Sequence, residues 1–157
     1  MADNERTTRL IIPALAPLYD GLRPLAMPLI RFAAGLFLMP HGAQKLFGWF
    51  GGSGIDGTAA FFSGKLGLDP GMFFAVLVGG TEFFGGLCLA IGFLTRPAAA
   101  GVIILMAVAV LKVHLPNGYF WTSAGFEYPL LWGLIALAFL FHGGGACSVD
   151  RRIGREL

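Results

Sequence analysis

Three polar side chains stand together at the end of a long apolar stretch of this sequence. His41, Gln44 and Lys45 close a hydrophobic run that begins near Leu25, and a glycine-rich segment follows them. Residues four apart lie on one face of a helix, so His41 and Lys45 are expected to point the same way. An imidazole, an amide and an ammonium group are costly to place in a bilayer. They form the first candidate site.

A carboxylate lies in the next apolar run. Glu82 is the one charged residue between positions 70 and 94, and pairs of glycines flank it. A carboxylate in the middle of a membrane is either paired or protonated. Small neighbours let helices approach closely, so we expect Glu82 to face protein and to pair with Lys45 or His41.

Two interpretations of this polar group remain open from the residues alone. In the first, a buried ion pair fixes how the helices pack. In the second, Lys45 or His41 donates a hydrogen bond to a quinone carbonyl, and Glu82 relays a proton. Aromatic residues nearby would then form the walls of a pocket that opens sideways to the bilayer: Phe37, Phe47, Trp49, Phe83 and Phe84.

Three more polar residues lie near the ends of later apolar runs, namely Lys112, His114 and Glu127. Lys112 and His114 are two apart, so on a regular helix they point in nearly opposite directions. Anchoring at the membrane interface explains both, and Glu127 at a helix start complements the helix dipole. We keep all three as candidate ligand-binding residues. We expect no metal site. His142 lies at the opposite end of the fourth span from His41 and His114, and two histidines with no fixed spacing do not indicate a metal.

Composition places the chain in the membrane. It has 157 residues, of which 56% are hydrophobic and 13% charged, with a mean hydropathy of +0.74. Soluble domains carry roughly 25% charged residues. A net charge of +2 gives no basis for nucleic-acid binding. Cys88 and Cys147 are far apart in the sequence, and we expect Cys88 to be a buried small residue and Cys147 a free thiol, with no disulfide between them.

The hydrophobic pattern predicts an all-α integral membrane protein, a four-transmembrane-helix bundle over residues 25–142. The spans are expected at about residues 25–47, 70–94, 97–113 and 126–141. Residues 55–68 are too short to span and predict a short amphipathic interfacial helix between the first and second spans. Residues 1–24 hold several prolines and form a partly interfacial N-terminal arm. Residues 143–157 form a basic tail.

The distribution of basic residues predicts the orientation. Eight arginines fall on the side of the termini and three lysines on the other: Arg6, Arg9, Arg23, Arg31, Arg96, Arg151, Arg152 and Arg155 against Lys45, Lys65 and Lys112. Both termini are therefore expected in the cytoplasm. Arg31 would extend its side chain back to the interface. The polar residues in the outer part of the membrane would then converge around the mouth of the bundle, and Glu82 would lie nearer the middle of the membrane. These outer residues are His41, Gln44, Lys45, Lys112, His114 and Glu127.

Several motifs occur in a characteristic order. They are Phe37–Gly52, Gly57–Phe62, Glu82 among glycines, Val113–Gly118 and Glu127-Tyr128. In this respect the chain resembles the DoxX family over about residues 29–150. The resemblance implies a small four-helix protein of the bacterial inner membrane. It also implies a quinone- or thiol-linked redox accessory subunit, because the family is named after a subunit of a thiosulfate:quinone oxidoreductase.

Three functions are consistent with these observations. The first is a redox accessory subunit with a quinone as cofactor and an oxidoreductase subunit as partner. The second is a small-solute or proton pathway, because charges inside a membrane also mark transport routes. The third is a structural anchor that holds a soluble oxidoreductase at the membrane. Whether the chain forms a homo-oligomer stays open.

Overall fold

The structure is a computed structural model that describes residues 10–157, and every regular element in that range is a helix. This confirms the all-α class. The main helices are α1 (Ala16–Phe47), α2 (Gly54–Leu66), α3 (Gly71–Gly80), α4 (Gly86–Ile91), α5 (Thr95–Val108), α6 (Glu127–His142) and α7 (Val149–Ile153). The π-helical turns are η3 (Thr81–Gly85) and η4 (Ala109–His114). The 3-10 turns are η1 (Pro13–Leu15), η2 (Trp49–Gly51), η5 (Leu115–Asn117) and η6 (Trp121–Ser123).

Among residues 10–157, three continuous helices are long and apolar enough to cross a membrane. They cover Pro13–Phe47, Gly71–Ile91 and Thr95–Asn117. The second of these joins α3, η3 and α4, and the third joins α5, η4 and η5. The helix α6 is also apolar but has only 16 residues.

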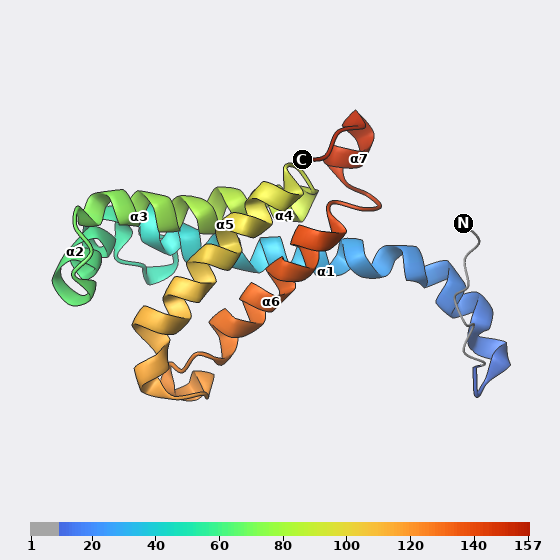
Figure 1. The fold of residues 1–157 in the computed structure, drawn as a ribbon, viewed down its shortest axis with the longest axis horizontal. Helices are drawn as coiled ribbons and strands as arrows, with labels where there is room; N and C mark the ends of the chain where they lie inside the picture. The colour runs from blue at the N-terminus through green and yellow to red at the C-terminus, as the bar shows by residue number, and fades with distance from the viewer. Residues whose placement is uncertain (1–9) are drawn as a thin grey trace.

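The first helix begins earlier than the sequence suggested. It starts at Ala16 rather than near Leu25, and Pro24 and Pro28 lie inside it. Proline is tolerated in membrane helices because neighbouring groups satisfy the carbonyls that it frees. Part of the predicted N-terminal arm therefore continues the first span as helix, and Figure 1 shows it extending beyond the other helices. Arg6 and Arg9 lie outside the described residues.

Glycines let α1 pack closely against the helix made by α3, η3 and α4. A Cβ atom on Gly35 would lie 2.2 Å from the carbonyl oxygen of Gly86. A Cβ atom on Gly42 would lie 2.4 Å from the backbone nitrogen of Phe83. Neither position can hold a larger residue without moving the helices apart, which is the packing expected of small residues in membrane helices.

The second half of the chain forms a helical hairpin. The helices α5 and α6 pack against each other, and their contact supplies most of one buried cluster: Leu38, Leu89, Ala99, Val102, Met106, Ala136 and Phe139. Figure 1 shows this hairpin meeting the other helices near α4 and then diverging from α2 and α3 toward its tip. The four long helices therefore do not close into a narrow bundle at that end.

The predicted basic tail is folded rather than free. Ser148 precedes α7, and its hydroxyl accepts a hydrogen bond from the backbone nitrogen of Arg151 at 3.1 Å. Asp150 is 4% exposed and accepts from the backbone nitrogens of Leu94 at 2.8 Å and Thr95 at 3.0 Å. The Thr95 hydroxyl donates to the same carboxylate at 2.7 Å. The tail is thereby tied to the turn between α4 and α5.

Arg31 does not reach back to the interface as predicted. It is 2% exposed and donates hydrogen bonds to the carbonyl oxygens of Gly144 and, at 3.0 Å, Cys147. The folded tail supplies acceptors inside the protein, and these offset the cost of burying the guanidinium group. Both cysteines are free thiols, as expected.

Candidate functional site

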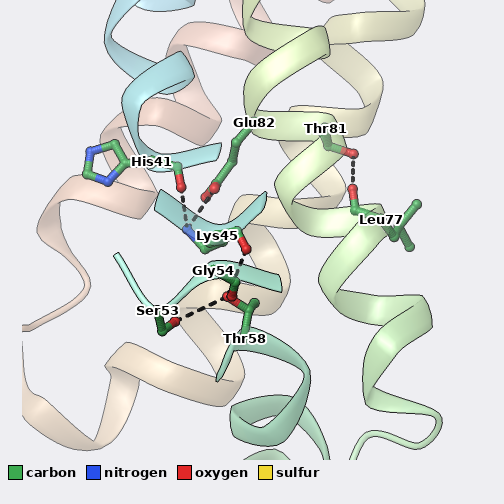
Figure 2. A network of polar contacts seen from close by, with 8 residues as sticks. All are labelled: His41, Lys45, Ser53, Gly54, Thr58, Leu77, Thr81 and Glu82. Carbon is green, nitrogen blue, oxygen red and sulfur yellow. Dashed lines mark hydrogen bonds and ion pairs between the residues drawn. The ribbon is translucent and has the colours of Figure 1, made fainter. Parts of the chain in front are cut away.

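The predicted contact between the first two spans is present. The Lys45 Nζ atom lies 2.6 Å from the Glu82 Oε2 atom, and Figure 2 shows the two side chains pointing toward each other from α1 and η3. The Glu82 side chain is 8% exposed and the Lys45 side chain 31% exposed. We call this the Lys45–Glu82 pair. The Lys45 side chain is therefore partly exposed, while the Glu82 side chain is enclosed.

A change of helix type positions the carboxylate. Glu82 lies in the π-helical turn η3, and the Thr81 hydroxyl donates to the carbonyl oxygen of Leu77 at 2.7 Å in the turn before it. A π turn inserts one extra residue into a helix and is frequent at functional sites. The close approach of α1 at Gly42 lets the Glu82 side chain reach Lys45.

The helix α2 contacts the backbone of Lys45. The Thr58 hydroxyl is 3.2 Å from the carbonyl oxygen of Lys45 and 2.7 Å from that of Gly54, and it lies 3.4 Å from the Ser53 hydroxyl (Figure 2). Thr58 is 5% exposed. Thr58 is not among the site residues predicted from the sequence. The one feature that could have indicated it is its hydroxyl side chain within the Gly57–Phe62 motif.

Four of the five predicted wall aromatics are in contact. Phe47 lies 5.0 Å from Trp49 and 5.3 Å from Phe83 between ring centroids, and Phe83 lies 5.1 Å from Phe84. Phe47 and Trp49 are about half exposed. Through these contacts Trp49, Phe47, Phe83 and Phe84 form one continuous aromatic cluster, and we call it the aromatic surface.

The side chains of His41 and Gln44 do not join the pair. The imidazole of His41 is exposed and points away in Figure 2, and only its backbone carbonyl lies near the Lys45 Nζ atom, at 3.5 Å. The Gln44 amide donates to the carbonyl oxygen of Phe50 at 3.3 Å. Gln44 therefore stabilises the turn after α1, and Lys45 is the donor that reaches Glu82.

The remaining three candidates, Lys112, His114 and Glu127, lie at the tip of the α5–α6 hairpin. The His114 Nδ1 atom is 2.7 Å from the carbonyl oxygen of Ala124, and the Glu127 carboxylate accepts from the backbone nitrogen of Trp121 at 3.0 Å. Both bonds close the loop between α5 and α6. Lys112 lies in η4 at the same tip. The prediction that these residues converge with Lys45 is wrong, because the α5–α6 hairpin diverges from α1 and α3 (Figure 1).

Two hollows in the surface lie away from the pair. One, of about 400 Å³, runs between α3, η3 and α5 and is apolar apart from Thr81. The other, of about 560 Å³, lies beside the folded tail. Neither is lined by Lys45 or Glu82. Within residues 10–157, no three His, Cys, Asp or Glu side chains are grouped so that they could hold a metal ion.

Comparison with known proteins decides the family. Residues 26–115 match the DoxX family model. The chain belongs to the DoxX family. The matched region includes Lys45, Glu82 and His114 but ends before Glu127. Together with the long apolar helices, this makes the chain a membrane protein.

Two relatives align with nearly the whole chain. An uncharacterized protein of Haemophilus influenzae is 30% identical over 144 residues, which is 87% of this chain and 97% of the relative. An uncharacterized membrane protein of Mycobacterium tuberculosis is 32% identical over 156 residues, or 92% of this chain and 91% of the relative. No solved structure matches the chain.

Proposed function

We propose that this DoxX protein is a redox accessory subunit of the membrane that binds a quinone-like ring beside the Lys45–Glu82 pair. The observation that carries the proposal is the unequal exposure of the pair, 31% for the Lys45 side chain against 8% for that of Glu82. An ammonium group has three donors. Two of them are directed to Glu82 and to the His41 carbonyl. One donor is left for a ligand that arrives from the exposed side.

The chemistry of a quinone suits this donor. A bound quinone would supply two-electron redox chemistry, with the electrons coming from a partner oxidoreductase. Lys45 would donate a hydrogen bond to one ring oxygen and stabilise negative charge there. Glu82 would hold the Lys45 ammonium group in position through their 2.6 Å contact.

The aromatic surface supports the same ligand. The rings of Phe47 and Trp49 are about half exposed and lie next to Lys45 in the sequence. Aromatic pairs favour offset or edge-to-face contacts worth about 0.5–1.5 kcal/mol beyond their buried area. A flat ring that entered from the bilayer would gain such contacts while its oxygen met Lys45.

We also propose the arrangement of the protein in the membrane. The helix α6 is the fourth span, α2 lies at the interface, and both termini face the cytoplasm of a bacterial inner membrane. At 1.5 Å per residue α6 is about 24 Å long, somewhat less than a hydrocarbon core of about 30 Å. The excess of basic residues on the side of the termini supports the orientation.

The test is binding of a short-chain quinone analogue to the purified protein, followed by calorimetry in one detergent. We expect saturable binding to the wild type and at least tenfold weaker binding to Lys45→Met. Lys65→Met is the matched control, because it makes the same change on α2, where Lys65 lies over the Phe61 ring and has no ion pair among residues 10–157. It should bind like the wild type.

A second variant separates a lost ligand contact from a disturbed fold. Trp49→Leu removes an aromatic ring and leaves the Lys45–Glu82 pair intact, so it should weaken quinone binding without lowering the unfolding temperature. The proposal fails if the wild type shows no saturable binding, or if Lys45→Met and Lys65→Met bind equally well. In either case the pair is a structural ion pair that fixes helix packing.

A further inference from the structure

The hollow beside the folded tail combines a polar wall with an apolar one. It has a volume of about 560 Å³, within the usual range for small-molecule sites. Met27 and Pro28 of α1 form its apolar side, and His142, Arg151, Arg155 and Glu156 lie on its polar side. We call it the tail hollow. Its residues Met27 and Pro28 precede Lys45 on α1 by about five helical turns, and Figure 1 shows α7 far from α2 and α3.

The two carboxylates of the tail hollow already have partners. Asp150 accepts hydrogen bonds from Leu94 and from Thr95 and lies near the buried Arg31. Glu156 accepts a hydrogen bond from the backbone nitrogen of Gly144, and its other oxygen is 3.4 Å from the Arg96 guanidinium. Each negative charge is therefore matched by a separate arginine outside the hollow.

The two arginines of the hollow are unmatched. Among residues 10–157, neither the Arg151 nor the Arg155 guanidinium has a hydrogen bond or ion pair. Their backbones are nevertheless held, because the Arg151 nitrogen donates to the Ser148 hydroxyl at 3.1 Å and the Arg155 nitrogen to the Asp150 carbonyl at 3.2 Å. The lining holds two arginines and two carboxylates, but Arg31 and Arg96 outside it match the carboxylates. The charges of Arg151 and Arg155, on a fixed stretch of backbone, are therefore left for a ligand.

We propose that the tail hollow binds the phosphate headgroup of an anionic phospholipid. Guanidinium groups match phosphate oxygens in paired hydrogen bonds. Leu25 and Leu29, which neighbour Met27 and Pro28 in the sequence of α1, are 51% and 67% exposed. Acyl chains can lie against these residues, so the geometry favours a lipid over a free phosphate ion. This inference does not rest on the quinone proposal.

Native mass spectrometry of the full chain tests the inference. The protein is titrated in detergent with phosphatidylglycerol and, separately, with phosphatidylcholine. We expect the wild type to retain phosphatidylglycerol in preference. Arg151→Gln and Arg155→Gln should each weaken retention about fivefold, the usual effect of one basic residue near anionic lipid. Arg152→Gln is the matched control, because Arg152 lies on α7 but does not line the hollow.

Each other result counts against the inference. Equal weakening by all three variants would show attraction to the basic surface in general, without a site in the hollow. Equal retention of the two lipids would show that the headgroup charge is not recognised. Displacement of the lipid by millimolar inorganic phosphate would show a phosphate ion site in place of a lipid site. Unfolding temperatures of the three variants verify that each is folded.

Discussion

Removing either partner of the Lys45–Glu82 pair should destabilise the protein, but by unequal amounts. The Lys45→Met variant leaves a carboxylate whose side chain is 8% exposed without its only cation at 2.6 Å. Breaking a buried pair from one side typically costs about 3–5 kcal/mol. We expect a loss of about 3–4 kcal/mol in the free energy of unfolding.

The converse change should be milder. Glu82→Gln leaves an ammonium group whose side chain is 31% exposed, so it can turn toward water and regain hydration. The glutamine also keeps the volume of the side chain and an acceptor for Lys45. The expected loss is about 1–2 kcal/mol, the usual effect of weakening a hydrogen bond to a charged group.

The assay is a double-mutant cycle by chemical denaturation in a single detergent. The double variant Lys45→Met with Glu82→Gln should be more stable than the sum of the single losses predicts, because it strands no charge. Contacting residues give coupling energies of about 0.5–3 kcal/mol. Additive losses, or a larger loss for Glu82→Gln than for Lys45→Met, would refute the argument from unequal burial.

Three further changes have defined outcomes. Gly35→Val should block the approach of α1 to Gly86, where a Cβ atom would meet a carbonyl oxygen at 2.2 Å, and lower the unfolding temperature more than Gly21→Val, which has open space. Thr58→Val should cost about 1 kcal/mol in a denaturation series, because it removes the hydroxyl that bonds the end of α1. Asp150→Asn should cost about 1.5–3 kcal/mol near neutral pH, since it removes charge-assisted bonds to Thr95. Burial acts to raise the pKa of Asp150, but these bonds outweigh it and hold that pKa below its ordinary 3.8. The stability that Asp150 adds is therefore complete above pH 3.8 and is lost as the pH falls further, so wild type and Asp150→Asn should converge in unfolding experiments below that pH.

The sequence alone determined the features that depend on local composition and on the cost of burying charge. Long apolar runs with few charges predict helices in a membrane, and the structure has them. A single carboxylate in such a run needs a cation at its own depth, and the glycines around Glu82 mark a close helix contact. These two facts were enough to predict that Glu82 pairs with Lys45 or His41 of the first span, and the structure shows that the partner is Lys45.

The tertiary structure decided how far apart the helices lie in the plane of the membrane. Lys112, His114 and Glu127 share a depth with Lys45 in the predicted topology, but depth does not set lateral distance, and the diverging α5–α6 hairpin takes them elsewhere. Arg31 is buried because Gly144 and Cys147 fold back onto it from the other end of the chain. Such long-range acceptors, like the π turn that carries Glu82, depend on neighbours that no local pattern in the sequence identifies.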